Sequence, residues 1–248
     1  MGTPKKTEME LLTRSRAKAA AVPRGEKTRQ DILKFAMDLA SAEGLEGLTI
    51  GRLAQELDMS KSGLFAHFGS KEELQLATVD AARAVFVTEI VDPYAGTTRG
   101  LERLQAMLEN WLRYVERSVF RGGCFFFAVS AEVDDRPGPV RDLVAELTKA
   151  WLDALEAEIQ QAQAATELNA KADAQLLAFQ LHAFVQEANW TFRLHNDPQA
   201  FARARAVIRQ CLALAATPSG EKRLLPVAKP AAQRVQKRTT KSKEKRKR

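Results

Sequence analysis

The segment from Thr49 to Leu74 constrains the fold of this chain most, because it carries two short helical patterns joined by a tight turn. The apolar residues of the first pattern recur at the spacing of one helical face: Ile50, Leu53, Ala54 and Leu57. Thr49 and Ser60 are suitable N-caps for two helices, the second of which is expected over residues 61–68. Asp58 lies in the turn, where aspartate tolerates a positive φ. The pattern is typical of a helix-turn-helix, whose second helix enters the major groove of DNA.

The predicted second helix has a polar outer side on which DNA contacts can be placed. Lys61, Ser62 and Phe65 fall on this side near the N-terminus of the helix, where base edges are met. Gly63 between them would let the backbone approach DNA closely. The alternative is an ordinary solvated helix face, which the surrounding motif makes less favoured. These four residues are therefore the predicted base-facing residues.

Three runs of residues between Lys27 and Val79 carry a more specific pattern. They are Arg29-Gln30-Asp31-Ile32-Leu33, Gly44-Leu45-Glu46-Gly47-Leu48-Thr49, and residues 60–74 with His67-Phe68-x-Ser70-Lys71-Glu72-x-Leu74. With these runs the chain resembles the TetR family of bacterial transcriptional repressors. The resemblance implies a homodimer with two recognition helices, a C-terminal domain that binds a small-molecule effector, and release from DNA when the effector binds.

The resemblance also implies which residues hold the DNA backbone. Thr49, His67 and Lys71 match family positions that contact phosphate, and such contacts set register without distinguishing sequences. For His67 the alternative is a partly packed imidazole that fills the turn. Phe65 stands where the family usually has tyrosine, and Ala66 where it often has a larger residue. A phenolic hydroxyl that would contact phosphate is therefore absent.

The charge of this 248-residue chain is unevenly distributed. The net charge is +7, but residues 217–248 hold twelve Lys/Arg and two Glu (+10), and residues 1–24 hold six Lys/Arg and two Glu (+4). Residues 25–216 therefore carry −7. The globular part is acidic, so the high pI reflects the two ends and does not by itself indicate DNA binding.

The sequence predicts an all-α protein with four parts. They are a basic flexible arm (1–24), a three-helix helix-turn-helix DNA-binding domain (25–75), a helical ligand-binding and dimerisation domain (76–216) and a basic disordered tail (217–248). Besides the two helices above, helices are expected over 27–43, 71–91, 98–117, 124–133, 140–163, 173–194 and 198–215. Pro198 is expected at the first position of the last helix, with Asn196 and Asp197 capping it.

Aromatic residues are frequent in the second domain, and the resemblance implies that some of them line an effector cavity. Trp111, Phe126 and Phe179 are the expected lining residues, for an unidentified and largely apolar small molecule. The alternative is that aromatic residues at helical spacing only fill a core. In the family the last two helices usually pair with a second chain. The apolar residues offered by these helices here are Leu177, Leu181, Phe184, Val185, Phe201, Val207 and Ile208.

The sequence gives little support for catalysis, and no metal ligand, cofactor or catalytic residue is expected. His182 and His195 have no cysteine or carboxylate at ligand spacing, and Glu158 has the character of a solvated surface carboxylate. The two cysteines are expected to be small buried hydrophobic residues in a reducing compartment. No apolar run is long enough to cross a membrane and no secretory signal is apparent. We therefore expect a cytoplasmic protein, associated with the nucleoid when it is bound to DNA.

Two functions fit these observations. The favoured one is a sequence-specific transcriptional regulator, a ligand-responsive repressor that binds a pseudo-palindromic operator in double-stranded DNA as a homodimer. The competing one is a non-specific or architectural DNA-binding protein driven by its basic ends, with a steep dependence on salt. Residues 27–80 contain six basic and nine acidic side chains. Specificity is therefore expected to depend on a few groups, chiefly Lys61, Ser62, Lys71 and helix N-termini.

Overall fold

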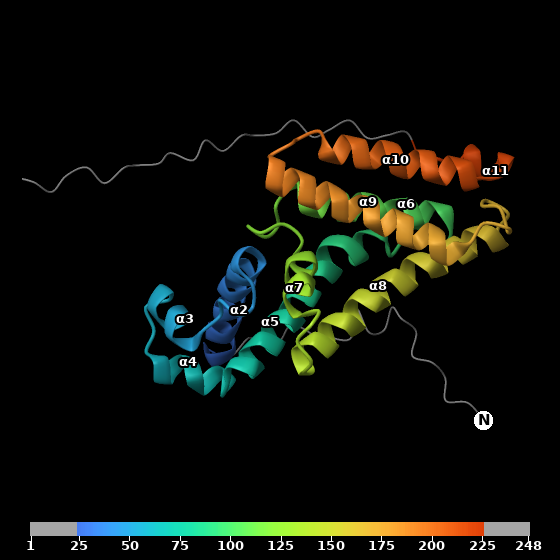
Figure 1. Cartoon of the computed structure of the whole chain (residues 1–248). Helices are drawn as coiled ribbons and strands as arrows, with labels where there is room; N and C mark the ends of the chain where they lie inside the picture. The colour runs from blue at the N-terminus through green and yellow to red at the C-terminus, as the bar shows by residue number, and fades with distance from the viewer. Residues whose placement is uncertain (1–23, 226–248) are drawn as a thin grey trace, which may run out of the picture.

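The computed structural model describes residues 24–225, and within this range the regular structure is helical. The described residues form no strand, and their one β-type pairing is an isolated bridge between Leu168 and Ala216. The all-α prediction is confirmed. Figure 1 shows a small helical head, a helix that leads away from it, and a larger helical body.

The head consists of α2 (Arg24–Glu43), α3 (Ile50–Glu56) and α4 (Lys61–Phe68). The first helix ends where Gly44 adopts a φ of 82° and its N–H donates to the carbonyl of Ala40. This is the left-handed ending that glycine favours. Apolar side chains from the three helices and their connections form the interior: Ile32, Ala36, Leu45, Leu48, Leu53, Ala54, Leu64 and Phe68.

The helix that leaves the head changes its geometry before it ends. α5 (Lys71–Phe86) starts at Ser70, whose hydroxyl accepts from the N–H of Glu73 at 3.1 Å, as the capping spacing predicts. A single helix to Val91 was expected, but Val87–Val91 (η1) form a π-helical turn and Asp92–Tyr94 (η2) a 3₁₀ turn. Widened turns of this kind are frequent at functional sites, and this one follows Phe86, which lines the interior pocket described below.

The body contains α6 (Leu101–Glu116), α7 (Phe125–Val133), α8 (Pro139–Ala164), α9 (Ala174–His195) and α10 (Ala200–Ala215). α9 and α10 pack side by side along one edge of the molecule, with α6 behind them (Figure 1). These helices follow the predicted ranges within a few residues at most ends.

The start of α10 was predicted wrongly. Asn196 adopts a left-handed φ of 52° after α9, and Asp197 accepts from the N–H of Gln199 at 2.9 Å. This turn occupies residues 197–199, so Pro198 lies before the helix, which begins at Ala200. Asp197 nevertheless stabilises the helix start, because it forms an ion pair with Arg203.

Glu158 on α8 is buried, in contrast to the expectation of a solvated carboxylate. It leaves 2% of its surface exposed and accepts from the N–H of Gly100 at 2.8 Å and from Arg99 Nε at 2.9 Å. The carboxylate therefore joins the start of α6 to the C-terminal part of α8. Sequence spacing could not show this contact, because its partners lie almost 60 residues away.

The beginning of the predicted tail is folded rather than disordered. Thr217 caps the short helix α11 (Pro218–Glu221), and Gly220 is buried where a Cβ would collide with the carbonyl of Glu167. Arg223 forms an ion pair with Glu167 at 2.6 Å. The tail boundary at 217 was therefore too early. The rest of the expected tail, from residue 226, and the expected arm over residues 1–23 lie outside the described residues.

Candidate nucleic-acid interface and interior pocket

The turn between α3 and α4 is built from two N-caps and one left-handed residue. The Thr49 hydroxyl accepts from the N–H of Arg52 at 3.1 Å, and the Ser60 hydroxyl accepts from the N–H of Gly63 at 3.0 Å. Both predicted caps are confirmed. Asp58 has a φ of 52°, the left-handed conformation that aspartate tolerates. Together these contacts fix the direction in which α4 leaves α3.

α4 turns the predicted base-facing side chains away from the core. Lys61, Ser62 and Phe65 are exposed, and Phe65 leaves 52% of its surface accessible. Gly63 also has a structural reason to be glycine, because a Cβ there would lie 2.9 Å from the Ser60 hydroxyl that caps the helix. The four residues thus come together on one short helix, at its N-terminal end.

The three residues expected to contact phosphate have different surroundings. Thr49 is exposed at the start of α3, whereas His67 is partly buried with its ring centroid 6.2 Å from that of Phe68. Lys71 Nζ lies 2.7 Å from Glu46 Oε2, and this contact lowers the pKa of Glu46. An ion pair between such exposed groups contributes only about 0–1 kcal/mol. A DNA phosphate could therefore compete with Glu46 for Lys71.

The head is attached to the body through α7 as well as through α5. The Glu132 carboxylate accepts from the backbone N–H groups of Leu45 and Glu46 at 2.6 and 2.7 Å. In the loop before α7, the N–H of Gly122 donates to Ser41 Oγ at 2.9 Å, and a Cβ at Gly122 would collide with the backbone of Ser41. The end of α2 and the loop that follows it are therefore held by the body.

The body encloses a small pocket of about 30 Å³ beside α5. Its lining comes from five helices and the residue before α7: Arg83, Phe86, Trp111, Cys124, Phe126, Leu147, Thr148, Trp151, His182 and Gln186. Trp111 and Phe126, both expected to line a cavity, lie here. The Phe86 ring meets those of Trp151 and Phe126 edge to face, with centroid distances of 4.9 and 5.8 Å. Such a volume accommodates little more than one or two water molecules.

The polar groups of the pocket are uncharged or already neutralised. Arg83 pairs with Asp80 at 2.7 Å. Burial lowers the pKa of His182 to about 4, so its imidazole is neutral at pH 7. Trp151 Nε1 and Gln186 Oε1 are buried, and neither has a hydrogen-bond partner within residues 24–225. Trp111 Nε1 is likewise buried without a partner in this range, so the pocket offers two donors and one acceptor among aromatic rings.

Phe179 does not belong to this pocket, in contrast to the prediction. It leaves 65% of its surface exposed on α9 and lines a separate surface hollow beside α8, together with Lys149 and Asp153. Its neighbour Ala178 is buried, and successive helix positions are about 100° apart. Phe179 therefore lies on the face of α9 that turns away from the core.

Comparison with known proteins matches both parts of this architecture. Residues 32–78 match the family described as bacterial regulatory proteins, tetR family, and residues 100–208 match the tetracyclin repressor-like C-terminal domain. The chain belongs to the TetR family. It is therefore a DNA-binding transcription regulator rather than an enzyme.

Individual TetR-family relatives agree with this assignment. The transcriptional repressor AcnR of Corynebacterium glutamicum is 38% identical over 103 residues, which are 40% of this chain and 50% of AcnR. The match thus spans about half the length of this curated relative. A TetR regulator from Chloroflexus aurantiacus superposes with a TM-score of 0.69 at 25% identity, over 75% of this chain and 93% of that one. AibR, solved with isovaleryl coenzyme A and operator DNA, shares the fold at a TM-score of 0.61 and 22% identity, over 73% and 96% of the two chains.

The residues that sequence reasoning missed in this TetR-family chain are the polar members of the pocket. His182 and Gln186 lie one helical turn apart on α9, and Trp151 lies on α8. Their apolar neighbours at helical spacing indicated an inward face, but not which helices meet there.

Among the described residues, no helix combines the length and the apolar character needed to cross a bilayer.

Proposed function

We propose that this protein is a ligand-responsive repressor that binds a pseudo-palindromic operator as a homodimer. The observation that carries the proposal is the path of α5. This helix begins at Lys71, after the cap residue Ser70 and close to the end of the recognition helix α4, and ends at Phe86 in the wall of the interior pocket. A change in the pocket can therefore be transmitted to the DNA-binding head by one continuous element.

Base recognition is assigned to the exposed end of α4. Lys61, Ser62 and Phe65 are the side chains available to meet base edges, and Thr49, His67 and Lys71 are assigned to phosphates. Because the head is acidic overall, with nine acidic and six basic residues over 27–80, these few groups carry the specificity. The basic ends of the chain add attraction that does not depend on sequence.

The pocket favours a neutral, largely aromatic effector with hydrogen-bonding groups. Its three unpartnered polar atoms, Trp111 Nε1, Trp151 Nε1 and Gln186 Oε1, fit a ligand that carries acceptors for the two indoles and one donor for the amide oxygen. Its arginine is already paired, and its histidine is neutral. The solved complex of AibR with a coenzyme A thioester and operator DNA supports effector binding within this fold.

Effector entry must enlarge the pocket, and this links binding to DNA release. A ligand larger than the 30 Å³ available has to displace rings such as those of Phe86 and Phe126. The first belongs to α5 and the second to α7, and both helices contact the head. Moving them changes the position of α4 relative to that of the partner chain. A coupling free energy of about 1–3 kcal/mol is sufficient for such regulation.

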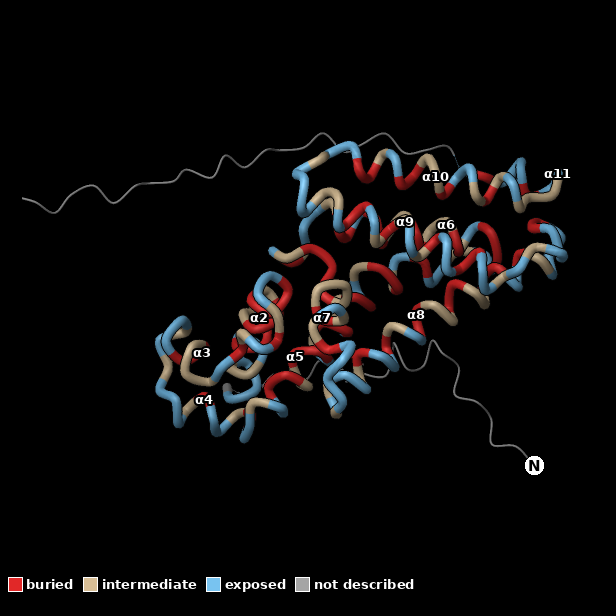
Figure 2. Tube along the Cα trace, viewed as in Figure 1, coloured by how far each residue is buried: buried red, intermediate tan, exposed pale blue. Residues whose placement is uncertain are grey.

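Dimerisation is assigned to the outward faces of α9 and α10. The residues expected on this face from sequence include several that are buried within the chain itself: Leu177, Leu181, Val185, Phe201 and Ile208. The exposed apolar residues of α9 instead form a stripe at helical spacing: Leu176, Phe179, Trp190 and Leu194. Figure 2 shows the exposed positions along both helices. Two such helices from each chain would form a four-helix bundle.

The test is genome-wide DNA selection with the purified protein, followed by a ligand screen for release from the selected site. We expect a pseudo-palindromic site whose half-sites lie about 34–36 Å apart, and release by neutral aromatic compounds. Selection that yields no preferred sequence would contradict the proposal. Release by strongly charged compounds alone would contradict only the effector assignment.

The second candidate is a non-specific DNA-binding protein, favoured by the ten Lys/Arg and single Glu of residues 226–248. Removal of these residues leaves every described contact in place and distinguishes the two functions. A repressor should retain its operator preference with a shallower dependence on salt. A coating protein should lose its DNA binding altogether.

A further inference from the structure

A second hollow lies between α6 and α10, and the proposed function does not use it. Its volume is about 350 Å³, within the range of about 300–1,000 Å³ that is typical of ligand sites. The lining residues are Gln105, Leu108, Glu109, Leu112, Arg113, Arg205, Ile208, Arg209, Leu212 and Leu225. None of them lines the interior pocket.

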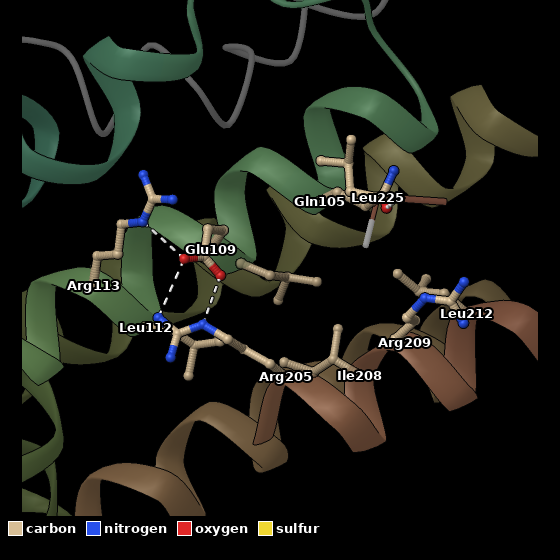
Figure 3. A pocket seen from close by; sticks show the side chains of 10 residues that line it. Gln105, Glu109, Leu112, Arg113, Arg205, Ile208, Arg209, Leu212 and Leu225 are labelled. Carbon is tan, nitrogen blue, oxygen red and sulfur yellow. Dashed lines mark hydrogen bonds and ion pairs between the residues drawn. The ribbon is translucent and has the colours of Figure 1, made fainter. Parts of the chain in front are cut away.

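The floor of this hollow is aliphatic. Leu108 and Leu112 from α6 face Ile208 and Leu212 from α10, and all four side chains are almost fully buried. Leu225 closes one end beside Gln105 (Figure 3). Its N–H donates to Gln105 Oε1 at 2.7 Å. The lining is therefore mainly apolar, and Leu225 is its most exposed apolar side chain.

The acidic groups around the hollow are already engaged by arginines. Arg205 Nε donates to Glu109 Oε2 at 2.9 Å, and its Nη2 donates to Glu116 at 2.8 Å. Glu109 also accepts from Arg113 Nε at 2.7 Å (Figure 3). Burial opposes the charge on Arg205, but the hydrogen bonds that it donates to the two glutamates outweigh burial and raise the pKa of Arg205. This guanidinium is therefore charged and fixed in place.

Arg209 is the exposed positive group of this lining, whereas Arg205 keeps one buried nitrogen, Nη1, without a hydrogen-bond partner among the described residues. Arg209 lies one turn after Arg205 on α10, is exposed, and pairs with no carboxylate within the described part of the chain. The lining holds three arginines against one glutamate, so an anion is favoured at its rim. A carboxylate matches the planar guanidinium with two parallel hydrogen bonds.

We propose that the α6–α10 hollow binds an aliphatic carboxylate, with its chain on the leucine and isoleucine floor and its carboxylate on Arg209. The basic residues 226–248 are a poor occupant because Arg209 repels them. A second copy of the chain is also disfavoured as the occupant. The apolar side chain that α10 exposes to a partner is Leu214, which is 90% exposed and lies about 140° around the helix from Arg209. The site is independent of the effector pocket and of the proposed repressor function.

The test measures decanoate binding to the full chain by isothermal titration calorimetry. Arg209→Gln removes the charge, and Arg193→Gln, another exposed arginine on a helix surface, is the matched control. We expect Arg209→Gln to weaken decanoate binding about tenfold or more, the control to leave it unchanged, and 1-decanol to bind more weakly than decanoate.

Three results would overturn this assignment. The first is an absence of decanoate binding to folded wild-type protein at millimolar concentration. The second is equal binding by the Arg209→Gln variant, which would place the ligand elsewhere, for example in the interior pocket. The third is displacement of decanoate by a synthetic peptide with the sequence of residues 226–237, which would assign the hollow to the end of the chain itself.

Discussion

Lys61 is the single residue on which the proposed operator specificity depends most, because it is the exposed cation at the N-terminal end of α4. If its ammonium contacts a guanine, Lys61→Ala should weaken operator binding by about 1–3 kcal/mol. Lys34→Ala, an exposed lysine on α2, is the matched control and should change the affinity little. Fluorescence anisotropy with the selected operator measures both. Full affinity in the Lys61→Ala variant would show that another residue contacts the bases.

For Phe65 we predict a substitution that strengthens DNA binding instead of weakening it. It is half exposed beside Lys61, and the phenolic hydroxyl usual at this family position is absent. Phe65→Tyr should strengthen DNA binding by about 0.5–1.5 kcal/mol, the net value of one added hydrogen bond. If the new hydroxyl contacts a phosphate, operator and unrelated DNA should gain equally. A gain confined to the operator would instead place residue 65 against a base.

His182 predicts a pH dependence of stability. Burial lowers its pKa to about 4 in the folded state, whereas an unfolded histidine titrates near 6.5. Between these values the unfolded chain binds more protons, so the free energy of unfolding falls as the pH decreases through this window. The loss between pH 7 and pH 5 should be about 2 kcal/mol. Urea denaturation at the two pH values should show a smaller loss for His182→Gln, but not for the exposed His195→Gln control.

At the scale of helices and turns, the sequence predicted those features that residues close together in the chain determine, such as helix caps. Thr49, Ser60 and Ser70 cap the helices that follow them, as their sequence positions predict, because a cap needs only its own turn. The π-helical turn after Phe86 and the late start of α10 were not predicted. The π-helical turn depends on tertiary packing, and the start of α10 depends on the turn that precedes it. The apolar spacing of the sequence shows neither.

The contact of Glu132 on α7 with the loop after α2 gives a prediction about how firmly this loop is held. Glu132→Ala leaves the N–H groups of Leu45 and Glu46 without the carboxylate that accepts from both. The free energy of unfolding should fall by about 1–3 kcal/mol, and hydrogen exchange at these two amides should accelerate. Glu132→Gln retains an acceptor oxygen and should have a smaller effect. Unchanged exchange at both amides in the alanine variant would show that α7 does not hold this loop.

At the scale of the whole molecule, the sequence could not indicate which apolar faces meet within one chain. Trp111 and Phe126 were expected beside Phe179, yet the first two line the interior pocket and the third faces outward. Only tertiary packing distinguishes an inward residue from an exposed one, so the sequence offered Leu177, Leu181 and Val185 of α9 to a partner chain although all three are buried within this chain.

The outward stripe on α9 can be tested as the dimer interface by a single charge. Phe179 is 65% exposed in the isolated chain and would be desolvated in a four-helix bundle. Phe179→Glu should therefore raise the dimer dissociation constant about 30-fold or more, as loss of an interface hot spot does. Phe65→Glu is the matched control, since Phe65 is similarly exposed but lies on α4.

Sedimentation analysis at micromolar concentration separates the two variants. The Phe179→Glu protein should sediment as a folded monomer, and the Phe65→Glu protein as a dimer that has lost operator binding. The monomer should also bind a full operator weakly, because the second half-site no longer adds its contacts through effective concentration. A stable dimer in the Phe179→Glu variant would exclude the α9 stripe from the interface. A monomeric wild type would contradict the dimeric repressor itself.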